Sequence, residues 1–173
     1  MLAVAGAFAA TAWSLEIGRR LSPAINRICM WVFSKVSRID EAHRINSSTW
    51  YTTALLILAI TMSPRDCALA VAVLAVADPC AALVGRRFGR LRIYGGRTLE
   101  GSLAFVASGS LTAVAVAALY HPGPAPTEQL ALALSAAVCG AIAELFSTSL
   151  DDNLTIPVAA ACGAALAGLA LGI

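Results

Sequence analysis

The chain has 173 residues, of which 59% are hydrophobic and only 13% are charged, and its net charge is +2. A soluble domain usually has about 25% charged residues, so this composition excludes an ordinary soluble protein and indicates an integral membrane protein. The length suits one compact helical bundle, and we therefore expect a single transmembrane domain over residues 1–173.

Six apolar segments along the chain are candidates for membrane-spanning helices. They cover residues 1–15, 50–63, 67–84, 101–120, 129–147 and 154–173. A helix that crosses the hydrocarbon needs about 20 residues, and about 17 suffice, so the first two segments are short. We still predict that all six cross the membrane, which gives an all-α bundle of about six transmembrane helices.

The basic residues predict how this bundle is oriented. All twelve Lys and Arg residues lie within the first 97 residues, and none follows. Because cytoplasmic loops are enriched in Lys and Arg, residues 17–49 and 85–99 should face the cytoplasm. The order of the spans then places residues 148–153 on the same side and residues 121–126 on the other. We expect the three cytoplasmic segments to meet at one face and to form the active site there.

Residues 23–39 are expected to form an interfacial amphipathic helix before the second span. One face of this helix is apolar, with Ile25, Ile28, Cys29, Val32, Phe33, Val36 and Ile39. The other face is polar, with Arg27, Ser34, Lys35 and Arg38. Such a segment lies on the membrane surface with its apolar side down. The alternative is that it packs beneath the cytoplasmic loops without touching lipid.

An ionisable residue, Asp78, interrupts the apolar segment 67–84 near its cytoplasmic end. A charge at this depth is costly, so such a residue is usually functional or paired. Pro79 removes a backbone donor and predicts a break or kink that could aim the Asp78 carboxylate into a cavity. The alternative is a structural ion pair between Asp78 and Arg86 or Arg87.

Residues 85–97, which follow this apolar segment, are rich in glycine and arginine. Glycines let backbone N–H groups approach an anion while guanidinium groups bind its oxygens. Residues 98–102 lead straight into a helix, whose N-terminus favours phosphate. The residues expected to bind a polyphosphate are Gly85, Arg86, Arg87, Gly89, Arg97, Thr98, Glu100, Gly101 and Ser102. Alternatively, the loop only fixes the topology, and the first two glycines form a helix-packing GxxxG pair.

Acidic residues lie opposite this basic loop in the expected topology. Glu144 lies in the lipid interior, where a functional or paired role is expected. Carboxylates near a polyphosphate indicate Mg²⁺, which takes one or two carboxylates together with phosphate oxygens. We expect Asp78 with Asp151 or Asp152 to bind this ion. Asp151, Asp152 or Asn153 could instead cap the last helix, whose N-terminus favours negative charge.

These residues form motifs that occur in a fixed order along the chain. The motifs are Asp78-Pro79, Gly85-Arg86-Arg87-Phe88-Gly89, Arg97-Thr98-Leu99-Glu100-Gly101-Ser102 and Asp151-Asp152-Asn153-Leu154-Thr155-Ile156-Pro157. Together they resemble the dolichol kinase/phytol kinase family, whose members are integral membrane enzymes that phosphorylate lipid alcohols, typically with CTP as donor. The resemblance extends from Glu41 to Pro157. Family members usually have Lys where this chain has Arg97, which keeps the charge but changes the geometry.

The middle motifs are also similar to those of the phosphatidate cytidylyltransferases, a related superfamily that uses CTP. That family ends in a His-Gly-Gly and Asp-Arg-Asp motif, which this chain does not contain. The segment 151–157 instead resembles the kinase branch.

The resemblance implies a membrane kinase that transfers the γ-phosphoryl group of CTP to the hydroxyl of a polyprenol, phytol, farnesol or diacylglycerol. Mg²⁺ would be the cofactor, Asn153 would join the nucleotide-binding residues, and Asp78, Glu144 or His43 would act as general base. His43 could equally bind phosphate or be an exposed residue without a chemical role. The expected partners are CTP, the lipid alcohol and the membrane but no nucleic acid, and a homodimer is compatible with the sequence.

Two other functions remain open at this point. A CTP-dependent cytidylyltransferase would form a CDP-lipid instead of a phosphorylated lipid. An anion transporter would account for the buried charges of Asp78 and Glu144, but it gives no reason for glycine-rich basic segments on one side only.

Overall fold

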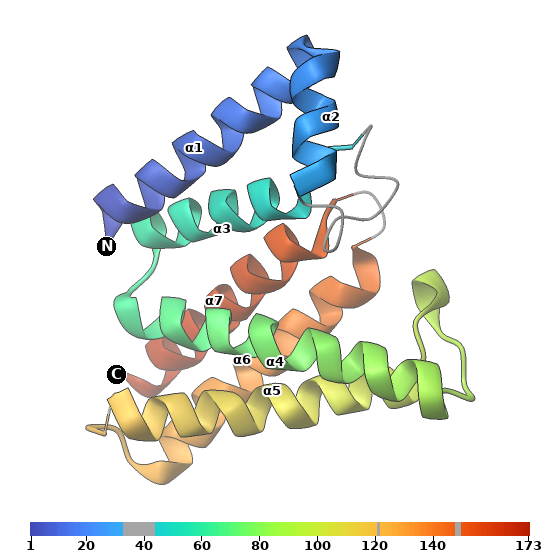
Figure 1. The fold of residues 1–173 in the computed structure, drawn as a ribbon. Coiled ribbons are helices and arrows are strands. Elements are labelled where there is room, and N and C mark those ends of the chain that lie inside the picture. The colour runs from blue at the N-terminus through green and yellow to red at the C-terminus, as the bar shows by residue number, and fades with distance from the viewer. Residues whose placement is uncertain (33–43, 121, 148–149) are drawn as a thin grey trace.

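The computed structural model describes residues 1–32, 44–120, 122–147 and 150–173. Within these ranges the regular structure is helical, which confirms the all-α prediction for this part of the chain (Figure 1). The elements are α1 (Leu2–Leu21), α2 (Pro23–Val32), α3 (Ser47–Thr61), α4 (Pro64–Phe88), the 3-10 turn η2 (Tyr94–Gly96), α5 (Leu99–Tyr120), α6 (Pro126–Phe146) and α7 (Asp152–Leu171).

Four helices in the described ranges, α4, α5, α6 and α7, are long and apolar enough to cross a membrane. The protein is therefore a membrane protein with several candidate transmembrane helices. The first two predicted spans correspond to α1 and α3, which do not reach this standard. The α3 helix has only 15 residues, and α1 carries Glu16, Arg19 and Arg20 near its end. Six spans thus remain a prediction, and four are supported.

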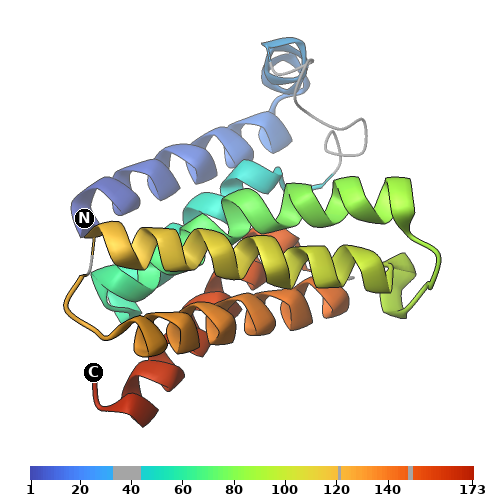
Figure 2. The same cartoon turned by 90° about the horizontal axis from the view of Figure 1, so that it is seen from below.

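The long helices form a bundle with α1 and α2 at its edge. The helix pairs α4 and α5, α5 and α6, and α6 and α7 make the most extensive contacts between neighbours, and α7 also packs on α4. Figure 2 shows α4, α5 and α6 running side by side. The α3 helix lies between α1 and α7, whereas α1 packs mainly on α3 and α2. The N-terminal helices therefore cover the bundle from one side only.

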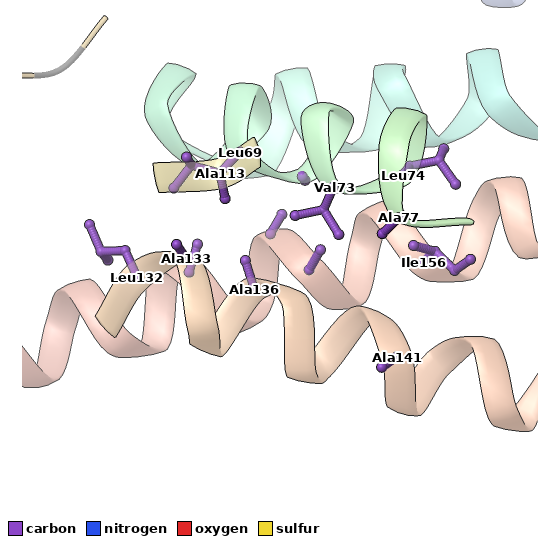
Figure 3. Packing of buried hydrophobic residues seen from close by; sticks show 14 of the residues in the cluster. Leu69, Val73, Leu74, Ala77, Ala113, Leu132, Ala133, Ala136, Ala141 and Ile156 are labelled. Atoms are coloured by element: carbon purple, nitrogen blue, oxygen red, sulfur yellow. The ribbon is translucent and has the colours of Figure 1, made fainter. Parts of the chain in front are cut away.

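Small side chains let the helices of this bundle approach closely. Figure 3 shows the core where α4, α6 and α7 meet. Its labelled buried residues are Leu69, Val73, Leu74, Ala77, Ala113, Leu132, Ala133, Ala136, Ala141 and Ile156. At Gly109 of α5, an added Cβ would lie 3.2 Å from the Cβ of Ala77 and 3.3 Å from that of Ala137. Contacts between small residues are typical of helix packing in membranes.

The α4 helix corrects two expectations. It continues through Pro79 up to Phe88, so the helix is not broken at Pro79, and a kink there stays a prediction. Gly85, Arg86 and Arg87 belong to its last turns rather than to a loop. The basic connection between α4 and α5 is therefore shorter than expected and covers only residues 89–98.

The first part of the predicted interfacial helix is observed as α2. Ile25, Ile28, Trp31 and Val32 are exposed on it, as expected for an apolar face that is available to lipid. Contact of α2 with the membrane surface stays a prediction, and the rest of the predicted helix, residues 33–39, lies outside the described residues.

Candidate functional site

Several polar segments meet at one end of the bundle. The start of α3, the connection 89–98, the end of α6 and the start of α7 all lie at this end, and the connection between α5 and α6 lies at the other (Figure 1). The Ser47 hydroxyl of α3 donates a hydrogen bond to Asp151 Oδ2 at 2.9 Å. The meeting of these segments at one end agrees with the prediction for the parts of the chain that the structure describes.

The connection 89–98 is closed on itself as a small hairpin. The Ile93 N–H donates to the Arg97 carbonyl at 2.9 Å, and the Leu99 N–H donates to the Leu91 carbonyl at 2.9 Å. The Leu91 N–H in turn donates to the Glu100 carboxylate at 3.3 Å. Glu100 therefore stabilises the hairpin in this structure, whereas the sequence predicted it to bind polyphosphate.

The tip of the hairpin docks onto α6. Gly95 and Gly96 form the turn with φ values of 65° and 78°, which residues with a side chain rarely adopt. The Tyr94 ring packs against the Phe146 ring with centroids 5.2 Å apart. This contact between the hairpin and the last turn of α6 brings Arg97 to Glu144.

The Arg97 guanidinium pairs with two carboxylates from different helices. Its Nη1 lies 3.0 Å from Glu144 Oε1, and its Nη2 lies 3.5 Å from Asp152 Oδ2. The Glu144 side chain is only 3% exposed, and its Oε2 makes no hydrogen bond among the described residues. A buried charge is costly unless it is paired, so Arg97 stabilises Glu144 while one carboxylate oxygen is left for a further ligand.

The position of Glu144 in an apolar segment suggested that it lies in the lipid interior. The structure buries it inside the protein instead. It points into the protein, where Arg97, Asp78 and Asp152 are the charges that act on its carboxylate. Asp78 and Asp152 were predicted to bind metal, and Arg97 was predicted to bind phosphate. All three thus form one electrostatic cluster with Glu144.

The three polar residues at the start of α7, Asp151, Asp152 and Asn153, make different contacts. Asp151 is the N-cap, and its Oδ1 accepts hydrogen bonds from the Asn153 N–H at 3.0 Å and the Asn153 side-chain amide at 2.8 Å. Since Ser47 donates to Oδ2, both Asp151 oxygens are used. The capping alternative thus describes Asp151, whereas Asp152 contacts Arg97 and Asn153 lines a cavity with Asp78.

The predicted glycines hold α4 and α5 close together. An added Cβ at Gly85 would lie 2.9 Å from Thr98 Oγ1, and one at Gly89 would lie 2.6 Å from Thr98 Cγ2. One at Gly101 would lie 3.4 Å from the Gly85 Cα. Thr98 Oγ1 also accepts a hydrogen bond from the Gly101 N–H at 3.2 Å. This geometry agrees with the packing alternative, and a role of these four residues in phosphate binding stays a prediction.

Four further residues were predicted to belong to the site. Arg86 and Arg87 are exposed on the last turn of α4, and the Arg87 guanidinium carbon lies 5.6 Å from the centre of the Phe88 ring. Ser102 Oγ is buried and makes no hydrogen bond among the described residues. His43 lies outside the described residues.

The acidic cluster fits a magnesium ion that also binds phosphate. No three His, Cys, Asp or Glu side chains of the described residues are arranged to hold a metal ion by themselves. Mg²⁺ however needs only one or two carboxylates when phosphate oxygens complete its coordination. Glu144 Oε2, which has no hydrogen-bond partner in the described part of the chain, and the partly exposed Asp152 are the oxygen donors that suit this ion.

Ser47 and Tyr94 connect the segments of the site and were not predicted to have this role. Ser47 lies at the start of α3 and joins it to α7, and Tyr94 fixes the hairpin on α6. The only signal for Tyr94 in the sequence is its position before two glycines, which marks a turn but does not identify the partner of the ring.

Comparisons with known proteins give one informative similarity. No protein-family model and no solved structure matches the chain. The chain is 29% identical over 152 residues to CTP-dependent diacylglycerol kinase 1 of Schizosaccharomyces pombe. The aligned region covers 81% of this chain and 68% of that protein. This chain is thus a distant relative of a CTP-dependent lipid kinase, in agreement with the family that its motifs resemble.

Proposed function

We propose that this protein is a CTP-dependent lipid kinase that transfers the γ-phosphoryl group of CTP to the hydroxyl of a lipid alcohol. The observation that carries the proposal is the junction of Arg97, Glu144 and Asp152 at one end of an apolar helical bundle. The distant similarity to CTP-dependent diacylglycerol kinase 1 supports the same function. Phosphoryl transfer depends mainly on positioning and on neutralising the phosphate charge, which such a junction can supply.

Arg97 is the proposed centre of triphosphate binding. Its guanidinium is 31% exposed, and its planar fork of N–H groups can bind phosphate oxygens while it stays near the two carboxylates. Arg86 and Arg87, exposed on the last turn of α4, would add positive charge around the phosphates. Binding of the nucleotide would thus draw on the same arginine that now balances Glu144.

Asp152 and Glu144 are the proposed ligands of Mg²⁺. Asp151 is a weaker candidate than expected because both of its oxygens accept hydrogen bonds within the protein. When bound, Mg²⁺ would neutralise charge on the β- and γ-phosphates. In its absence, Arg97 holds the two carboxylates in place through its ion pairs.

The proposed reaction is a direct displacement at the γ-phosphorus. The hydroxyl oxygen of the lipid forms a bond to this phosphorus, the bond to the oxygen that bridges the β- and γ-phosphates breaks, and CDP leaves. The hydroxyl proton passes to a carboxylate, for which we propose Asp78, because it lines a cavity that an acceptor can enter.

The acceptor and the orientation belong to the same proposal. Because the relative is a CTP-dependent diacylglycerol kinase, diacylglycerol is the first acceptor to test, followed by polyprenol, phytol and farnesol. The positive-inside rule supports an active site at the cytoplasmic face, because the exposed arginines of α4 and the hairpin lie at the end of the bundle that carries the site.

Transfer of a radioactive label distinguishes the candidate reactions. The purified protein is incubated with Mg²⁺, with CTP that is labelled on either the γ- or the α-phosphate, and with either diacylglycerol or phosphatidate. Label that passes from γ-labelled CTP to diacylglycerol supports the kinase. Label that passes from α-labelled CTP to phosphatidate, with release of pyrophosphate, would instead identify a cytidylyltransferase. No transfer to any of the four lipid alcohols would overturn the proposal, and flux of anions into vesicles would then favour a transporter.

A further inference from the structure

A cavity of about 240 Å³ lies between α3, α4 and α7. It is lined by Tyr51 of α3, by Val71, Leu74, Ala75 and Asp78 of α4, and by Asn153 of α7. The four α4 residues follow the i, i+3, i+4, i+7 spacing of a single helix face. One face of α4 thus forms a continuous wall of the cavity.

The cavity changes from apolar to polar along α4. With a rise of about 1.5 Å per residue, the wall from Val71 to Asp78 is about 10 Å long. Val71, Leu74 and Ala75 form the apolar part of the wall, and Asp78 follows them on the side toward the C-terminal end of α4. Asn153 belongs to the first turn of α7, which begins at the end of the bundle where α4 finishes (Figure 1). The polar part of the cavity therefore faces the end of the bundle that carries Arg97.

The polar part of the cavity adjoins the proposed triphosphate site. The Asn153 side-chain amide donates to Asp152 Oδ1 at 3.2 Å, and Asp152 Oδ2 lies 3.5 Å from Arg97 Nη2. Asp78 also acts electrostatically on Glu144, the other partner of Arg97. A group bound in the cavity would thus lie next to the residues proposed to hold the phosphates.

The cavity is open at the side of the bundle. The α3 helix packs mainly on α1 and α7 and makes little contact with α4. Ala75 is exposed, and Tyr51 and Val71 are half-buried. Since one water molecule occupies about 30 Å³ of liquid, the cavity has room for a small group of atoms but not for a whole lipid. Long hydrocarbon chains would have to leave through the opening between α3 and α4.

We propose that this cavity binds the hydroxyl-bearing end of the lipid alcohol, whose hydrocarbon chains leave between α3 and α4 into the bilayer. This inference rests on the proposed lipid kinase function and adds the acceptor site. Tyr51 and Asn153 supply hydrogen-bonding groups for the hydroxyl end. Ala75 sets the width of the cavity, because a larger side chain at this position would fill it.

A pair of neighbouring substitutions tests the site by kinetics. Ala75→Phe should raise the KM for diacylglycerol by about tenfold or more, which corresponds to about 1.4 kcal/mol, while the Kd for CTP stays within about twofold. Val76→Phe is the matched control, because Val76 is exposed on the same helix and does not line the cavity. Retained CTP binding shows that both variants are folded. An unchanged KM for diacylglycerol in Ala75→Phe, or a raised Kd for CTP instead, would overturn the assignment.

Photo-crosslinking tests the same site without relying on catalysis. A diacylglycerol with a diazirine next to the glycerol should crosslink to the wild-type protein at residues 51 and 71–78, and Ala75→Phe should abolish this crosslink. Crosslinks confined to other helices would overturn the acceptor site even if the kinase is active. A crosslink in the cavity without phosphoryl transfer to any lipid alcohol would keep the lipid site and overturn the kinase function.

Discussion

Replacement of Arg97 by alanine should lower both the stability of the protein and its affinity for CTP. In the structure Arg97 lies 3.0 Å from Glu144, which is 3% exposed, and 3.5 Å from Asp152. Removing one partner of a fully buried pair costs about 3–5 kcal/mol. Arg97 is itself 31% exposed, so solvent reduces this cost, and we expect a loss of about 1–3 kcal/mol in the free energy of unfolding.

The effect on CTP follows from the loss of a charge-assisted contact to phosphate. Such a contact contributes about 1.5–3 kcal/mol, so Arg97→Ala should raise the Kd for CTP about 10- to 150-fold. Arg97→Lys should recover part of the affinity, because lysine keeps the charge but lacks the planar fork. Arg92→Ala is the matched control, because Arg92 is exposed in the same hairpin and forms no ion pair within the described ranges. It should change the Kd by less than about twofold.

A double variant separates the two effects of Arg97. Glu144→Gln in the Arg97→Ala background removes the unpaired buried charge, and it should restore most of the thermal stability but not the affinity for CTP. Thermal unfolding in detergent micelles and titration with CTP measure the two quantities. If the double variant also regained CTP affinity, Arg97 would act only by neutralising Glu144. Equal and small effects of Arg92→Ala and Arg97→Ala on the Kd would mean that the triphosphate binds elsewhere.

Three further predictions concern catalysis, topology and stability. Asp78→Asn should abolish phosphoryl transfer without lowering the temperature of unfolding, because it removes a charge at nearly constant shape. A rate near that of the wild type at saturating Mg²⁺ would show that Asp78 has only a structural role. Single cysteines placed at Arg92 and at Gly123 in a cysteine-free background should react with a membrane-impermeant thiol reagent from opposite sides, and reaction from the same side would contradict the topology. Glu16→Gln should lower the free energy of unfolding by about 3–5 kcal/mol, because it leaves a buried arginine without its carboxylate. Arg20→Ala should lower the free energy of unfolding by only about 1 kcal/mol or less, because this partner of Glu16 is 50% exposed. Chemical denaturation measures both variants. Equal losses for Glu16→Gln and Arg20→Ala would show that burial does not govern the contribution of these ion pairs.

The sequence by itself determined where the helices lie. Apolar stretches and the polar breaks between them depend on local composition, so the six predicted segments coincide with α1, α3, α4, α5, α6 and α7. The same patterns indicated that residues of the basic connection and the start of α7 would meet at one end, which the contact between Arg97 and Asp152 bears out. Local patterns suffice here because a helix satisfies its backbone hydrogen bonds within its own segment.

The tasks of individual residues depended on the tertiary structure. The sequence could not show that Arg97 is paired with Glu144, because the contact joins two segments through the docking of Tyr94 on Phe146. It also left open which acidic residue caps α7, a task that falls to Asp151 because the helix begins at the next residue.

The environment of Asp78 also depends on the tertiary structure. The cavity beside it exists because α3 packs on α1 and α7 and leaves one face of α4 partly uncovered. Spacing along a helix predicts which residues share a face, but the partner of that face is set by the packing of helices that are distant in the sequence. A motif therefore identified Asp78 as a candidate, and only the arrangement of three helices placed it beside a cavity.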